Sequence, residues 1–221
     1  PAARLGGPAG LCVPGPGAPF TRAHPGLASD PMGWISVSLG DACNRGRLDA
    51  FVSNIAARGY LFQNNNLRLN GMAESGKFRN VAEGPIADAG WAWGSQFGDL
   101  NNDGANELFV VNGFISADRK KSYWYSMSKI AGANGRLFED ATTWPAFGTA
   151  SLSGYERSRV YLNRGVAGWV DVAGKVGVTD GYASRGACLA RLVNTRRGVG
   201  GAPPPRRRRA LGPTWELVVR P

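Results

Sequence analysis

Short apolar runs separated by glycine-rich turns set the hydrophobic pattern of this chain. The run 108–111 (Leu-Phe-Val-Val) is typical, because it is brief and rich in β-branched and aromatic residues, as strands are. No stretch sustains apolar residues at i, i+3, i+4 and i+7 over several turns, which is the spacing of an amphipathic helix. The 32 glycines and 14 prolines supply turns between the runs. The pattern predicts an all-β fold.

An internal repeat organises these runs. The segment 40–54 aligns without a gap with the segment that starts at residue 98, at a spacing of 58 residues, and Asp41 falls on Asp99. Three or four short strands follow in each unit of about 45–60 residues, which favours β-propeller blades over a sandwich. We therefore expect β-propeller blades, in about two to three recognisable units.

Composition divides the chain into three parts. Residues 1–32 are rich in Gly, Pro and Ala and predict an extended arm, residues 33–194 carry the blades, and residues 195–221 form an Arg/Pro-rich tail. An insert at about 115–157 lengthens the second unit and is either a helix with a loop or a long excursion from the blade rim. Its aromatic residues either bind a sugar or peptide or pack the insert onto the blades; they include Tyr123, Trp124 and Trp144.

The loop 99–107 has the pattern of a calcium site. Oxygen-bearing side chains stand at loop positions 1, 3 and 5, a glycine at 6 and a carboxylate at 9, and calcium prefers such oxygen ligands around a tight turn. An EF-hand would need a glutamate at position 12, where Val110 stands, whereas a metal-free turn remains the simpler alternative. The predicted ligands are the side chains of Asp99, Asn101, Asp103 and Glu107 and the backbone carbonyl of Ala105.

The equivalent loop in the first unit has lost part of this pattern. Asp41 and Asp49 remain, but Cys43 and Arg45 replace the residues at positions 3 and 5. Because arginine keeps its charge, Arg45 can pair with either aspartate and replace an ion. We expect weak or absent calcium binding there, and a third loop expected near residue 190 lacks the ligands altogether.

The segment 97–113 resembles the FG-GAP/VCBS repeat, the calcium-loop blade of integrin α-like β-propellers. Residues 90–104 together with 159–174 are also similar to secreted propellers that carry an ASPIC/UnbV segment. The resemblance covers about residues 33–194 and implies a calcium-binding propeller, placed outside the cell or in the periplasm, that binds or adheres to a protein or glycan. Such propellers have about seven blades, so two units and part of a third predict a partial or truncated copy.

The remaining features narrow the function. The net charge of +10 is concentrated from residue 185 onward, so polyanion or nucleic-acid binding through Arg206–Arg209 is an alternative function. A carbohydrate-active propeller that uses the insert is another. No nucleophile, metalloprotease or nucleotide motif is present, which predicts a protein that is not an enzyme, with no catalytic or cofactor-binding residues besides the structural calcium ligands.

The three cysteines and the chain ends complete the sequence-based expectations. Two of the three cysteines, Cys12, Cys43 and Cys188, form a disulfide, or the cysteines are small packing residues. His24 is the one histidine of the sequence and completes no zinc-binding pattern with them. No apolar run is long enough to span a membrane. The chain starts at Pro1 without a signal segment and is expected to be a mature piece, an excised domain or an incomplete product, and the tail is either a disordered extension or a frame-change product.

Overall fold

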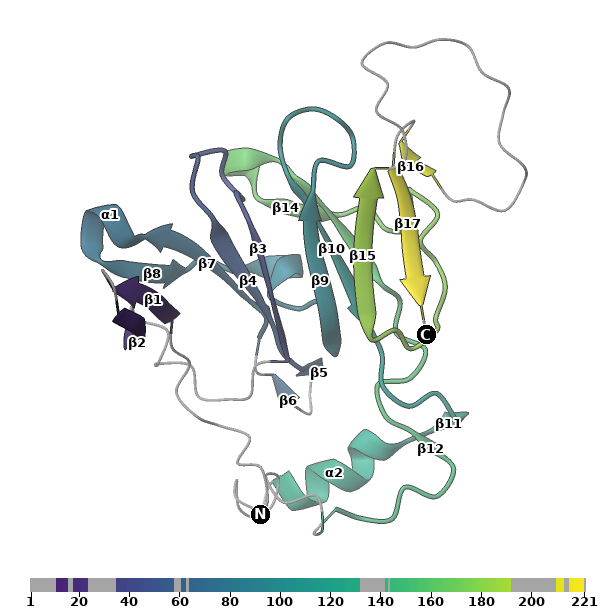
Figure 1. Ribbon diagram of the computed structural model, residues 1–221. Helices are drawn as coiled ribbons and strands as arrows, with labels where there is room; N and C mark the ends of the chain where they lie inside the picture. The colour runs from purple at the N-terminus through teal and green to yellow at the C-terminus, as the bar shows by residue number, and fades with distance from the viewer. Residues whose placement is uncertain are drawn as a thin grey trace, which may run out of the picture.

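The structure is a computed structural model that describes residues 11–15, 18–23, 35–57, 61–62, 64–131, 142, 144–191, 210–212 and 215–220. Two four-stranded antiparallel sheets stand side by side at its centre (Figure 1). The strands of each sheet follow one another in chain order, with a short strand pair inserted in the first and the long insert in the second, so each sheet is a meander. This arrangement confirms the all-β prediction and the division into blade-like units.

The first sheet, blade 1, holds β3 (Ser36–Gly40), β4 (Asp49–Ser53), β7 (Asn66–Gly71) and β8 (Lys77–Asn80). The second, blade 2, holds β9 (Ala92–Gly98), β10 (Glu107–Asn112), β13 (Arg159–Asn163) and β14 (Trp169–Asp171). In both blades the second strand is buried along its whole length, because neighbouring layers cover both of its faces. This explains the continuous apolar run of β10 that the sequence displays.

The first strands of successive units lie against one another. Ser38 Oγ and Ser95 Oγ are 2.8 Å apart, which joins β3 to β9. On the other side of β9, Gln96 Oε1 accepts a hydrogen bond from Leu189 N at 2.7 Å, which joins β9 to β15 (Gly186–Arg191). The strand β15 is therefore the first strand of a third unit, as the repeat predicts. The described strands make two blades and this edge, and they do not close a ring.

Three apolar clusters fill the spaces between these layers. Phe51, Leu108 and Tyr161 belong to the cluster between the two blades. Phe109 and Val111 point the other way and pack, with Leu189 of β15, into a second cluster. Alternate residues of β10 thus serve both interfaces, since successive side chains of a strand point to opposite faces.

The insert forms the third cluster and settles one alternative from the sequence. It contains β11 (Asp118–Ser122), α2 (Tyr123–Ala131) and β12 (Ala150–Ser151), so it is a helix with a loop. Tyr123 and Trp124 are only 1% and 6% exposed, and the Tyr123 ring stacks on Phe147 with the centroids 3.9 Å apart. Trp124 packs on Trp91 of blade 2. These aromatic rings hold the insert against the blade.

The ends of the chain differ in part from the expected arm and tail. The segment 1–32 contains the antiparallel pair β1 (Leu11–Gly15) and β2 (Ala18–Ala23); β1 ends within the Pro-Gly-Pro-Gly turn signal of the sequence and β2 begins directly after it. In the tail, β17 (Trp215–Arg220) pairs with β15 and with β16 (Ala210–Gly212). The described part of the chain also has the short pair β5 (Ala56–Ala57) and β6 (Leu61–Phe62), α1 (Met72–Ser75) and the 3-10 turns Gly84–Ile86 and Gly165–Ala167.

Within the described residues, no helix is both long and apolar enough to cross a membrane.

Candidate metal-binding loop

The candidate loop connects β9 to β10 at the upper end of blade 2 (Figure 1). Its turn requires left-handed backbone at Asn102 (φ 60°) and Gly104 (φ 89°), which asparagine and glycine adopt most readily. Asp99 closes the turn, because its two carboxylate oxygens accept hydrogen bonds from Asp103 N and Gly104 N, each at 3.0 Å. The first predicted ligand is thus also the residue that shapes the loop.

Glu107, the first residue of β10, forms the inner wall of the loop. It is 2% exposed, and its Oε2 accepts a hydrogen bond from Leu100 N at 2.9 Å, which ties the two ends of the loop together. Its other oxygen, Oε1, is buried and has no hydrogen-bond partner. Burial raises the pKa of this carboxyl and the Asp103 charge adds to the increase, whereas the backbone N–H groups of Leu100, Asn101 and Asn163 oppose it. A buried carboxylate oxygen without a partner is a costly feature that a bound cation would relieve.

The two exposed ligand candidates are engaged in turn bonds. Asn101 Nδ2 donates to Asp103 Oδ2 at 2.8 Å, and Asp103 Oδ1 accepts from Ala105 N at 2.8 Å. Among the described residues, no group of three His, Cys, Asp or Glu side chains is close enough to hold a metal ion by itself. A cation here would therefore need the amide oxygen of Asn101 and the Ala105 carbonyl as well, and Asp103 would have to exchange its local bonds for the ion.

The loop of blade 1 has the same backbone scaffold. Asp41 accepts hydrogen bonds from Arg45 N at 2.9 Å and Gly46 N at 2.6 Å, and Asp49 Oδ2 accepts from Ala42 N at 3.1 Å. These bonds match those of Asp99 and Glu107 one for one. Burial raises the pKa of Asp41, but the backbone N–H groups of Arg45, Gly46 and Cys43 outweigh it and lower the pKa overall.

The two loops differ at the second carboxylate oxygen. In blade 1, Asp49 Oδ1 receives the Arg45 guanidinium (Nη2) at 2.7 Å and Asn70 N at 2.7 Å, and Asp49 is 0% exposed. The equivalent oxygen of blade 2 is the unpartnered Glu107 Oε1. The ion pair between Arg45 and Asp49 that the sequence allows is therefore present. It places a permanent cation where the blade 2 loop has none.

Asparagine side chains join the two loops, and no motif in the sequence indicates these contacts. Asn44 Nδ2 donates to Gly104 O at 3.0 Å, and Asn106 Nδ2 donates to Asp41 O at 3.1 Å. Asn163, at the end of β13, donates to both Ala42 O at 2.9 Å and Asn106 O at 3.1 Å. No spacing rule points to Asn163, because it lies far along the chain from both loops. We call these four hydrogen bonds the inter-loop asparagine contacts.

The other residues singled out from the sequence fall outside this site. Cys43 and Cys188 are free and exposed, and no disulfide joins them. Trp144 is partly buried beside Phe147 in the insert. The described residues do not include His24 or Arg206–Arg209, nor the side chain of Cys12 or the third-loop segment that follows β15.

The family comparison agrees with this geometry. Residues 41–110 match the model of a family described as FG-GAP-like repeat. The chain contains an FG-GAP-like repeat. The match begins at the first residue of the blade 1 loop and ends within β10, so the FG-GAP-like repeat includes both acidic loops. No curated protein and no solved structure matches the chain.

Proposed function

We propose that this chain is a calcium-stabilised propeller module that binds a protein or glycan outside the cell. The ion is structural, and no catalytic role is assigned to the loops. One calcium ion binds in the blade 2 loop through Asp99, Asn101, Asp103, the Ala105 carbonyl and Glu107. The FG-GAP-like repeat supports the module, and the ligand set supports the ion, since calcium takes oxygen ligands from carboxylates, amides and backbone carbonyls.

One comparison carries the calcium proposal. Two loops with the same backbone hydrogen bonds differ in whether a cation reaches the second carboxylate oxygen, which is Asp49 Oδ1 in one and Glu107 Oε1 in the other. A buried anion costs free energy unless it is paired or binds a metal. Arginine fulfils that need in blade 1, and calcium fulfils it in blade 2.

The proposed ion fastens the interface between the blades. The loop it occupies contacts the neighbouring loop through the inter-loop asparagine contacts. Because a ligand that binds only the folded state stabilises it by mass action, about 2.7 kcal/mol is gained at a calcium concentration 100 times Kd. We expect that gain to reach both blades, since the contacts bridge them.

Titration calorimetry on the full chain, after treatment with a chelator, tests the proposal. We expect about one calcium ion per chain in the parent. Asp103→Asn removes a negatively charged ligand and is expected to bind calcium at least about tenfold more weakly. Because the Asp103 side chain is exposed, its replacement leaves the core intact. Glu83→Gln is the matched control, since Glu83 is also exposed and lies outside the loop. No binding heat in the parent protein, or equal affinity in Asp103→Asn, would contradict the proposal.

A further inference from the structure

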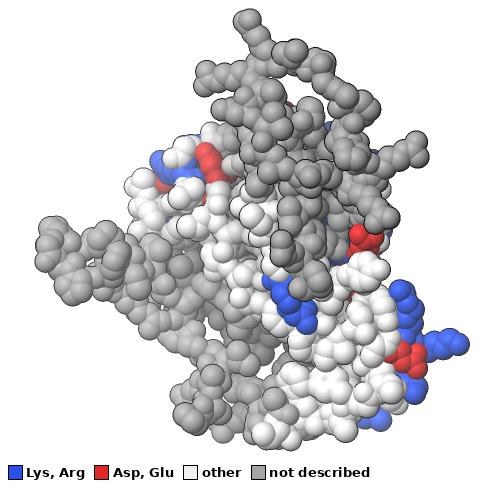
Figure 2. Space-filling view, turned by 45° about the vertical axis from the view of Figure 1, so that its right-hand side comes forward, with Lys and Arg blue, Asp and Glu red and all other residues white. Residues whose placement is uncertain are grey.

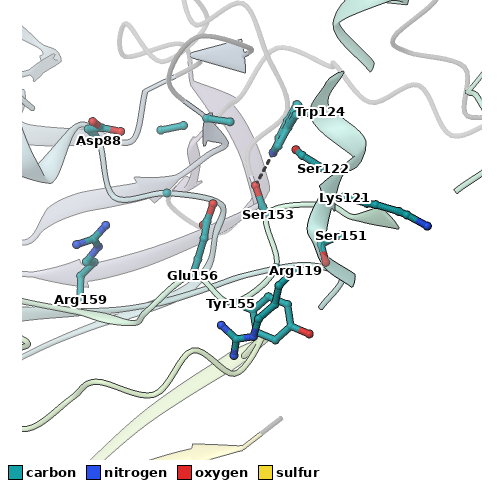
Figure 3. A pocket seen from close by; sticks show the side chains of 14 residues that line it. Asp88, Arg119, Lys121, Ser122, Trp124, Ser151, Ser153, Tyr155, Glu156 and Arg159 are labelled. Carbon is teal, nitrogen blue, oxygen red and sulfur yellow. Dashed lines mark hydrogen bonds between the residues drawn. The ribbon is translucent and has the colours of Figure 1, made fainter. Parts of the chain in front are cut away.

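A polar pocket of about 420 Å³ lies between the insert and the two blades (Figure 3). The insert that lines this pocket lies at the lower end of the blade strands, at the end opposite the acidic loops (Figure 1). Side chains from β11 and α2 line one side, and residues of the turn that leads into β13 line the other. The volume is in the range typical of small-molecule sites.

A strained turn shapes one wall of this pocket. Ser153 (φ 43°) and Tyr155 (φ 61°) both have left-handed backbone, which non-glycine residues rarely adopt. Gly154 lies between them, where a Cβ would be 2.3 Å from the Ile115 carbonyl oxygen, so the turn is pressed against the strand-like segment beside it. Such outliers persist only where the surroundings hold them, and they gather at ligand sites. The turn directs Tyr155 and Glu156 toward the pocket (Figure 3).

Arg119 is a basic group of the pocket lining that rests on an aromatic ring. Its guanidinium lies 3.8 Å from the centroid of the Tyr155 ring, and no oxygen of the described residues accepts a hydrogen bond from it. Of the other basic residues of the lining, Arg159 pairs with Asp171 at 2.8 Å through Nη1, while its buried Nε has no hydrogen-bond partner among the described residues. Lys121 donates to Thr149 Oγ1 at 3.2 Å and lies 3.8 Å from Asp118 Oδ2. A planar guanidinium can receive a carboxylate with two hydrogen bonds, and the Tyr155 ring beneath it supports Arg119 in place.

The acidic groups of the pocket limit what this ligand can be. Asp88 and Glu156 also line the cavity, and Glu156 Oε2 already accepts a hydrogen bond from Trp91 N at 2.8 Å. Two carboxylates oppose a dianionic phosphate more than a single carboxylate. They also favour a ligand that donates hydrogen bonds, and Ser122 adds a further hydroxyl on the opposite wall (Figure 3).

We propose that this pocket binds a hydroxylated carboxylic acid of the uronic-acid class, with Arg119 as the residue that receives its carboxylate. The sugar hydroxyls donate to Glu156 and Asp88 and exchange hydrogen bonds with Ser122. The insert presents a further basic residue at its surface, since Lys129 is exposed on α2. Figure 2 shows blue side chains gathered at the lower right of the molecule, where the insert lies. Their charge draws an acidic ligand toward the pocket. This inference rests on the binding role proposed above and is independent of the calcium site.

Chemical-shift titration of the full chain with D-glucuronate, and with D-glucose as the neutral probe, tests this assignment. We expect shifts at the pocket with glucuronate, binding at least about tenfold weaker with glucose, and a similar loss for glucuronate in Arg119→Gln. Lys120→Gln is the matched control, because it removes the same charge from the adjacent exposed position of β11 without touching the pocket.

Three outcomes would overturn the proposal. Equal affinities for glucuronate and glucose would show that the carboxylate is not recognised. Equal losses of glucuronate affinity in Arg119→Gln and Lys120→Gln would show that Arg119 acts only through the general surface charge. N-acetyl-aspartate amide binding as tightly as glucuronate would assign the site to acidic peptides instead. The same titration in excess chelator separates the two proposals, since glucuronate binding without calcium would leave this site standing if the calcium site failed.

Discussion

At the scale of single residues, the two acidic loops show how one scaffold satisfies a buried carboxylate in two ways. Both loops begin with an aspartate that caps the turn and end with a carboxylate that binds the backbone near the loop start. Only the blade 1 loop supplies its own cation, through Arg45. Under the proposed calcium binding, the cost of a buried charge explains why an ion is expected in the blade 2 loop and not in the blade 1 loop.

Replacement of Glu107 by glutamine separates the free-energy cost of burying this carboxylate from its proposed role as a calcium ligand. Glutamine keeps an acceptor for Leu100 N and removes the unpaired negative charge. In chelator, we expect the free energy of unfolding of Glu107→Gln to exceed that of the parent by about 1 kcal/mol, so the variant unfolds at a higher temperature. We expect added calcium to stabilise the variant less than the parent. Thermal unfolding at several calcium concentrations measures both effects. An unchanged response to calcium would exclude Glu107 as a ligand.

Glu156 is expected to give the protein a pH dependence whose sign follows from the burial of its carboxyl. Burial raises the pKa of this carboxyl, the Trp91 N–H, the Ser153 hydroxyl and Arg159 oppose the increase, and Asp88 adds to it. Between its unfolded and folded pKa values the folded state holds the extra proton, so the contribution of Glu156 to stability falls as pH rises through this interval and is lowest above the folded pKa.

Glu156→Gln is the variant that tests this sign. It keeps an acceptor for Trp91 N but removes the titration. We expect its stability relative to the parent to increase from pH 4 to pH 7, by about 1.4 kcal/mol for each unit of pKa shift. Urea unfolding at the two pH values measures the difference. A relative stability that does not change with pH, or that changes in the opposite direction, would show that the Glu156 carboxyl has no raised pKa.

At the scale of elements, the close approach of the first strands sets the distance between the blades. A Cβ at Gly40 of β3 would lie 2.4 Å from the ring of Phe97 on β9. We expect Gly40→Ala to destabilise the protein by about 1–3 kcal/mol, because the ring is held in the core between the blades. Urea unfolding measures this change. Gly186→Ala on β15 is the control, since no atom lies within 4 Å of its added Cβ, and an equal loss in both variants would contradict the packing argument.

At the scale of the whole molecule, the repeat in the sequence predicted the arrangement of the strands. The spacing of 58 residues placed β3 and β4 on β9 and β10, and the fold keeps this correspondence down to individual hydrogen bonds. The sequence could predict this arrangement because the turn glycines and the apolar runs recur together at the same spacing in both units.

The contacts between units could not be read in the same way. The inter-loop asparagine contacts depend on Asn163, which no motif marks, and on how the blades stack. The sequence also left the role of the insert's aromatic residues open. Ligand-binding sites and packed cores are both rich in aromatic residues, so the presence of Tyr123 and Trp124 does not distinguish the two. Their burial became known only from the position of α2 against Trp91. The pocket beside Arg119 likewise brings together β11 and a turn far along the chain.

The most direct test of the account is the number of calcium ions bound by the parent and by a loop 1 variant. The double variant Cys43→Asn with Arg45→Asp gives the blade 1 loop the residue types that Asn101 and Asp103 provide in blade 2, and it removes the guanidinium from Asp49. Equilibrium dialysis with calcium is expected to give about one ion per chain for the parent and about two for the variant, the second more weakly held because Asp49 is shorter than Glu107. No bound ion in the parent, or an unchanged number in the variant, would contradict the claim that Arg45 occupies the place of an ion.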